Sequence, residues 1–446
     1  MTRLIVSDLR VHVSTWVWTF MVAVTCAAAL AAQLRVMHGS LASARAAGNA
    51  DMVEAAGTLA GWVIATVVLT ALPVLASTVT QALELRRRDL GLWRALGMRP
   101  GLVVTVVGVQ LTLLGGLGGL LGVGLGVPLS RLVMHLMVAE QAALPGTVSA
   151  AGAADLPVVI GSTAAVCLTG GLRSAWRTSR TPEALLLRGQ SAPSRLGRWL
   201  GIMCRLGMVA ALTAALVATV LAVPPDQESA VNQAVGGAFA SLAMVIVLTP
   251  WVAPLLQHFA GWVVAGGGPA WFLATRTCSV ESRRSSATVL PFTIAIGLVG
   301  TLFAMNTVGA SGVTSQGFLA MFGPCLLVAW VGGIGIIAMA AGRRRHDAAL
   351  LVAAGARLGQ VRLTEISEGV IHTATAALLG LAATVASLAC LNTVLDLGTP
   401  DLLRNGPWTQ VGVAVGATLL VCCVTIALST RGGTGASLTS ELRTAE

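Results

Sequence analysis

Ten long runs of apolar residues, separated by shorter polar stretches, dominate the sequence. Each run has about 20 residues, the length that an α-helix needs to cross the hydrocarbon core of a bilayer. A helix satisfies its own backbone hydrogen bonds in lipid, so the pattern predicts ten transmembrane helices. They are expected at residues 13–32, 59–79, 102–129, 156–172, 206–223, 231–255, 287–305, 321–342, 366–390 and 409–429.

Composition narrows the fold class further. Only 10% of the 446 residues are charged and 55% are hydrophobic, whereas soluble domains carry about 25% charged residues. A water-soluble fold is therefore excluded, and we expect an all-α polytopic membrane protein. The connection at 33–58, between the first two spans, is expected to be a polar loop.

The basic residues indicate the membrane topology and exclude a phosphate-binding loop for ATP in this chain. All 28 are arginine, and without lysine the phosphate-binding motif G-x-x-x-x-G-K-[ST] cannot form, so any ATP-driven work needs a second chain. With both termini in the cytoplasm, 24 arginines lie inside and four outside, namely Arg35, Arg45, Arg131 and Arg404. This asymmetry explains the net charge of +10 by the positive-inside rule, without nucleic-acid binding.

Few residues offer chemistry of their own. The eight cysteines form no C-x-x-C pair and lie mostly in apolar runs, so we expect neither metal site nor cofactor in this chain. Asp and Glu are missing from the middle of all ten runs, which disfavours an ion-coupled carrier. At the inner end of the ninth run, Glu368 is expected to pair with Arg362 or His372, as a local ion pair or as a gating lock.

An internal repeat divides the chain. Residues 86–101 align without a gap on residues 344–359, at a constant offset of 258, and eight of the 16 pairs are identical. The identical positions of the first copy are Arg86, Arg87, Asp89, Leu92, Ala95, Gly97, Arg99 and Gly101. We therefore expect two parallel four-helix repeats, 1–190 and 271–446, with an inserted helix pair in 191–270 between them.

The repeated segment has the pattern of an amphipathic helix beneath the membrane. Over residues 84–99, Leu85, Leu92, Trp93 and Leu96 give an apolar stripe at helical spacing. Gly97 is expected to end this helix, and Pro100 to begin the third span. The arginines Arg86, Arg87, Arg94 and Arg99 are expected to face a protein surface or, as the alternative, anionic lipid headgroups.

Glycines in two runs are expected to let helices approach closely. The third run carries them at small-x-x-x-small spacing, and the tenth run repeats the spacing once. They are Gly115, Gly118, Gly119, Gly122 and Gly126, with Gly412 and Gly416 in the tenth run. Static packing and a sliding contact between the halves both fit this pattern.

These features resemble the FtsX-like or MacB-like permeases of ABC transporters. The family signature, approximately R-x-x-E-[LI]-x-x-L-[RK]-A-L-G-A, corresponds to RRDLGLWRALGM at 87–98. The glycine-rich third helix corresponds to GGLGGLLG at 115–122, and the segment P-x-x-x-L-[RK] to PEALLLR at 182–188. Asp89 stands where glutamate is usual, the second copy departs further, and the family's large extracellular domains are absent here.

The resemblance implies that each repeated segment is a coupling helix for a separate ABC ATPase subunit. Two segments imply two ATPase copies per chain, with ATP and Mg bound by the ATPase. The coupling residues would be Arg86, Arg87, Asp89, Leu92, Trp93, Arg94, Leu96, Gly97 and Arg99, then Arg344, Arg345, Asp347, Leu350, Gly355 and Arg357. The chain itself would be a permease subunit in a bacterial cell membrane, in contact with lipid and not an enzyme.

Three functions remain open at this point. The first is export or clearance of an amphipathic or hydrophobic compound, such as an antimicrobial peptide, an antibiotic or a lipid-like molecule. The second is an ATPase-driven regulator of an extracytoplasmic or membrane partner, which the short outer loops disfavour. The third is an ion-coupled secondary transporter, which the missing membrane carboxylates disfavour.

Overall fold

A computed structural model describes residues 13–48, 50–180, 195–222, 227–263, 268–280, 282–307, 315–396 and 406–431. The P-x-x-x-L-[RK] segment at 182–188, the expected boundary near residue 190, Arg404 and both chain termini lie outside this part. The chain divides into two compact units. The first consists of Met1–Leu206 and Ser311–Gly332, and the second of Gly207–Ala310 and Gly333–Glu446.

The described residues form helices joined by short connections. Ten of these helices are long and apolar enough to cross a membrane, which confirms the expected polytopic all-α fold. The prediction of a polar loop at 33–58 is wrong, because α2 (Val13–Ala46) and α3 (Ala50–Leu85) continue through almost all of it. A run of apolar residues marks only the part of a helix that lipid covers, so it does not show where the helix ends. Alanine, which is abundant in 41–60, favours helix in water as well, so the helices extend beyond the apolar runs.

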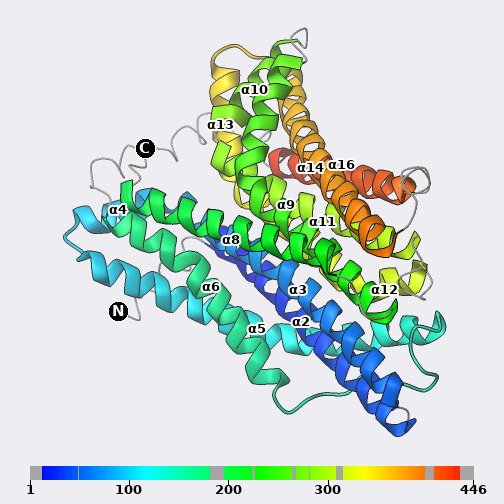
Figure 1. Ribbon diagram of the computed structural model, residues 1–446. Helices are drawn as coiled ribbons and strands as arrows, with labels where there is room; N and C mark the ends of the chain where they lie inside the picture. The colour runs from blue at the N-terminus through cyan, green and yellow to red at the C-terminus, as the bar shows by residue number, and fades with distance from the viewer. Residues whose placement is uncertain are drawn as a thin grey trace. The chain divides into compact units, whose positions relative to one another are not determined.

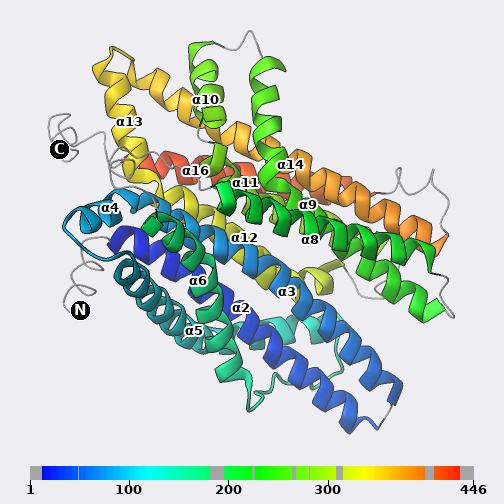
Figure 2. The same ribbon diagram turned by 60° about the vertical axis from the view of Figure 1, so that its left-hand side comes forward.

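The first unit is built around a four-helix bundle. Helix α5 (Pro100–Ala139) packs against both α2 and α6 (Asp155–Arg180), and α3 packs against α2 and α6. In Figure 1, α2 and α3 lie side by side as a hairpin. The short helix α4 (Arg87–Ala95) lies at the end of the unit opposite to the α2–α3 turn, as Figure 2 shows.

Glycines of α5 bring it against two neighbouring helices. A Cβ at Gly122 would overlap Ala27 Cβ, and one at Gly126 would lie 2.7 Å from Ala31 Cβ, both on α2. On its other side, a Cβ at Gly115 would lie 2.7 Å from Ala164 Cα, on α6. Gly118 faces α2 and Gly119 faces α6 in the same way. The glycines therefore set the separation between α5 and its neighbours.

Gly122→Leu is expected to destabilise the first unit. The added side chain would press on Ala27 and on the backbone of Ala28, whose nitrogen lies 2.9 Å from the Cβ position. Overpacking of this kind costs about 1–3 kcal/mol. Gly124→Leu on the same helix is the matched control, since no atom lies within 4 Å of its Cβ position. Thermal unfolding in detergent measures the difference; equal stability of the two variants would contradict this packing.

The second unit packs around the long helix α14 (Leu358–Leu395). Six of the described helices lie wholly in this unit: α9 (Gln227–Val263), α10 (Pro269–Val280), α11 (Ser282–Thr307), α13 (Ala341–Ala353), α14 and α16 (Trp408–Arg431). Two more helices are divided between the units: the part of α8 (Arg195–Leu221) from Gly207 onward and the part of α12 (Ser315–Met339) from Gly333 onward belong to the second unit. Helix α14 packs against α9, α11 and α16. Gly380, 258 residues after Gly122, meets Ile296 and Gly297 of α11, as Gly122 meets α2.

The expected role of Gly412 and Gly416 in helix packing is not seen. Both glycines are exposed on α16, and no atom lies within 4 Å of a Cβ placed at either one. The small-x-x-x-small spacing puts two glycines on one helix face but does not decide which face the neighbouring helix covers. In α16 the packed face carries Val411, Ala414, Thr418 and Cys422 instead.

Candidate functional site

In each unit a turn joins a short helix to a long helix, and we call this short helix with its turn the elbow. In the first unit α3 ends at Leu85, α4 follows directly, and α5 begins at Pro100. Pro100 occupies the first turn of α5, where its missing N–H costs no hydrogen bond. The helix expected over 84–99 is therefore shorter than predicted, while its end near Gly97 and the restart at Pro100 are confirmed. In the second unit, α13 and α14 form the corresponding elbow.

The two elbows have the same backbone hydrogen bonds at the offset of 258. Gly97 N donates to Arg94 O at 2.9 Å, as Gly355 N donates to Val352 O at 2.9 Å. Met98 N donates to Trp93 O, and Ala356 N donates to Leu351 O. These two bonds form a Schellman cap, which needs a left-handed residue after the helix. Gly97 and Gly355 supply it, with φ of 93° and 97°.

The capping bonds continue into the long helices. Val103 N donates to Arg99 O at the start of α5, and Val361 N donates to Arg357 O at the start of α14. The two copies share this backbone geometry although their side chains differ, since Leu358 stands in the second copy where Pro100 stands in the first. The elbow is therefore one structural device that is present twice in the chain.

A buried arginine fixes the first elbow to its unit. Arg86 is 2% exposed, and its guanidinium carbon lies 5.0 Å from the centroid of the Trp16 ring on α2. Next to it, Arg87 pairs with Glu84 at 3.2 Å. The expectation that Arg86 faces a partner or lipid is therefore wrong. Arg86 lies directly between α3 and α4, so its side chain points into the bundle. There its guanidinium group makes a cation–π contact with the ring of Trp16.

The second elbow is held by the equivalent arginine through a carboxylate. Arg344, 258 residues after Arg86, is 7% exposed, and its Nη1 donates to Glu368 Oε2 on α14 at 2.9 Å. Arg345 Nε donates to Ser429 O on α16 at 2.8 Å. The predicted pairing of Glu368 with Arg362 is wrong, because residues six apart lie on different faces of a helix and Arg362 is exposed.

The remaining elbow residues leave a mixed surface available to a partner. Leu92 is 46% exposed and its equivalent Leu350 is 48% exposed, although both are large apolar side chains. Leu96 is more exposed still, and Arg99 and Arg357, which follow the short helices, are exposed as well. Asp347 is also exposed, whereas Asp89, Trp93 and Arg94 are half-buried. Exposed leucines and exposed arginines on one short segment are suited to docking on an acidic protein groove.

Sequence reasoning missed the groups that hold the elbows in place. Trp16 lies outside the repeated segments, so the alignment at offset 258 did not indicate it. The same offset does place Gln110 at the position of Glu368, and Gln110 is buried. The alignment at offset 258 therefore pairs the buried Gln110 with the half-buried Glu368, the carboxylate that binds Arg344.

The region around the first elbow is similar to one known protein family. Residues 61–182 match the family described as FtsX-like permease C-terminal. The match includes part of α3, all of α4 and α5, and α6. No curated protein matches the chain.

Proposed function

We propose that this chain, whose residues 61–182 form an FtsX-like permease domain, couples ATP hydrolysis by a separate ABC ATPase to the clearance or export of an amphipathic or hydrophobic compound. One ATPase copy would dock at each elbow. The observation that carries the proposal is the duplicated elbow, with the same capping bonds, the same left-handed glycine and a buried arginine at the same position. ATP and Mg would be bound by the ATPase.

The geometry gives each group a mechanical role. Leu92 and Leu350 would enter apolar pockets of the ATPase, while Arg99 and Arg357 would bind its carboxylates. A force on α4 or α13 would reach the long helix through the capped glycine. Because the buried arginine ties the short helix to its own bundle, the elbow would move with that bundle and not as a loose loop.

The proposed topology places both elbows and both termini in the cytoplasm. It follows the distribution of arginines between the two sides. On this proposal 1–190 and 271–446 are the repeats of a multi-pass protein in a bacterial membrane, with 191–270 inserted. Lipid would surround the bundles.

Gly97→Pro and Gly355→Pro together test the elbows. Proline fixes φ near −65° and lacks the N–H that Gly97 and Gly355 donate, so both caps would be lost. We expect an ATPase that co-purifies with the wild-type chain from native membranes to be absent from the double variant. Gly101→Pro with Gly359→Pro is the matched control, since both positions lie in the first turn of a long helix. A wild-type chain that never carries an ATPase would contradict the proposal and favour an ion-coupled carrier.

A further inference from the structure

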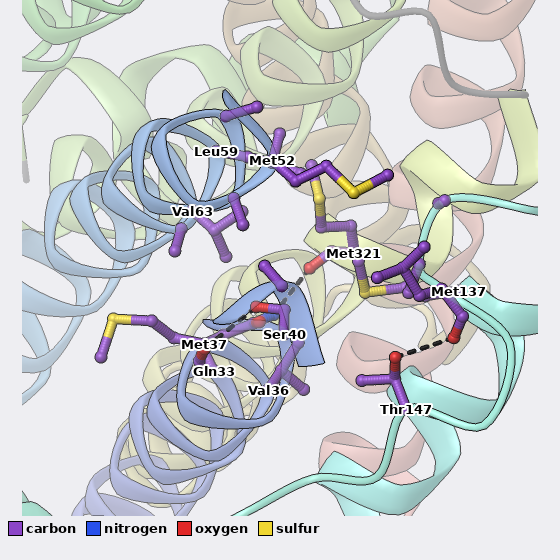
Figure 3. A pocket seen from close by; sticks show the side chains of 17 residues that line it. Gln33, Val36, Met37, Ser40, Met52, Leu59, Val63, Met137, Thr147 and Met321 are labelled. Carbon is purple, nitrogen blue, oxygen red and sulfur yellow. Dashed lines mark hydrogen bonds between the residues drawn. The ribbon is translucent and has the colours of Figure 1, made fainter. Parts of the chain in front are cut away.

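A pocket lies in the first unit, at the end of α2 and α3 opposite to the elbow. Its volume is about 220 Å³, and its walls are α2, α3, Met137 of α5, the connection after α5 and Met321 of α12. Met321 belongs to the first unit. Figure 3 shows the side chains around it, among them Met37, Met52, Met137 and Met321, which come from four different helices.

The lining of this pocket is apolar and deformable. None of its residues is charged, and alanine and methionine account for more than half of them. Methionine is unbranched and polarisable, so methionine walls adapt to flexible apolar ligands. An apolar cavity of about 150 Å³ stays dry and takes up benzene, so a pocket of about 220 Å³ has room for a segment of hydrocarbon chain.

The polar atoms of the pocket are satisfied with one exception. Ser40 donates to Met37 O, and Thr147 donates to Leu144 O. Gln33 is only 1% exposed, and its Nε2 donates to Met321 O at 2.6 Å. Its Oε1 accepts no hydrogen bond from the residues that the structure describes. A buried amide oxygen without a donor costs free energy, and a ligand that brings a donor removes this cost.

We propose that this pocket binds one hydrocarbon chain of an amphiphile whose first polar group donates a hydrogen bond to Gln33 Oε1. Of the lining residues, Met52 is exposed, whereas Val63 and Met137 are buried. A single-chain amphiphile with a hydroxyl or amide N–H fits both the apolar wall and the unsatisfied acceptor. The assignment of this amphiphile as transported substrate rests on the proposed function; its binding does not.

The test uses the full-length chain in lipid nanodiscs without any ATPase. The probe is dodecanol with a photoreactive diazirine at the end of its chain, and adducts are mapped by mass spectrometry. We expect adducts on the peptides that carry Met37, Met52 and Met137, and competition by unlabelled dodecanol. Ala56→Trp, which fills the pocket from α3, should lower the yield at least tenfold. Ala65→Trp is the matched control, since Ala65 is exposed on the same helix.

A second comparison tests the hydrogen bond without a bulky substitution. Dodecanol should compete about fivefold better than its methyl ether, the effect of one hydrogen bond near 1 kcal/mol. In Gln33→Met this preference should vanish, because methionine keeps the size of the side chain but offers no amide oxygen. Adducts spread over lipid-facing helices, or equal competition by alcohol and ether in the wild type, would overturn the proposal. Neither result would affect ATPase association at the elbows, so the two proposals fail separately.

Discussion

Leu92→Glu and Leu350→Glu are each expected to weaken the docking of one ATPase copy by about 30-fold. Loss of an interface anchor costs about 2 kcal/mol or more, and a glutamate would also oppose the acidic groove that the arginines suit. Both leucines are about half exposed in the chain alone, so the fold should tolerate the change. The measurement is the ratio of ATPase to permease after purification of the complex.

The double variant sharpens this result. The two leucines belong to different elbows, so their effects should add and leave ATPase only at background level. Val148→Glu is the control, because Val148 is an exposed apolar residue at the end of the first unit opposite to the elbow. An unchanged ratio in the double variant would show that the exposed leucines contact lipid and not an ATPase.

Glu368→Ala is expected to destabilise the second unit by about 3 kcal/mol. The substitution leaves Arg344 buried without its carboxylate, and breaking a buried ion pair costs about 3–5 kcal/mol. The lower figure applies because Arg344 and Glu368 line a cavity of about 520 Å³, which has room for water to solvate the cation left unpaired. The melting temperature in detergent should fall by roughly 6–12 °C.

Two further variants separate the ion pair from other causes. Arg362→Ala, which removes the exposed arginine once expected to bind Glu368, should change stability by no more than about 0.5 kcal/mol. Replacing Arg344 and Glu368 together by methionine should recover much of the loss, since no charge is then left unpaired. If Arg362→Ala destabilised as much as Glu368→Ala, the assignment of the pair would be incorrect.

The sequence predicts those features of the fold that depend on local pattern. Runs of about 20 apolar residues located all ten membrane-crossing helices, and Gly97 with Pro100 located the first elbow. The offset of 258 located the second elbow, where Pro100 is replaced by Leu358. Backbone conformation and burial in lipid depend mainly on residues close together in the sequence, so a local pattern is enough to predict these features.

Three further errors concern which surface a side chain meets. Arg86 was expected to face outwards and is buried on Trp16, a residue 70 positions earlier in the chain. Glu368 was assigned to a neighbour on its own helix and pairs across to Arg344. Gly412 has the spacing of a packing glycine but lies on an uncovered face. Tertiary packing decides each of these contacts, and the periodicity of residues within one helix carries no information about which neighbouring element that helix meets.

The unexpected length of α2 and α3 explains why the pocket was not anticipated. Its walls include residues 33–44 and 52–63, most of which were expected to form a polar loop. Their helical conformation brings Gln33, Met37 and Ser40 onto one side of α2, facing Met52 and Leu59 of α3. Met137 near the end of α5, the connection after α5, and Met321, all distant in sequence, complete the cavity.

The most direct test of the docking role is photocrosslinking from the elbows in living cells. A benzoyl-phenylalanine placed at Leu96, and separately at its equivalent Ala354, samples the exposed end of each short helix. The account predicts that both positions crosslink to an ATPase chain carrying the G-x-x-x-x-G-K-[ST] motif. Crosslinking of either position only to lipid or to proteins outside the cell would contradict it.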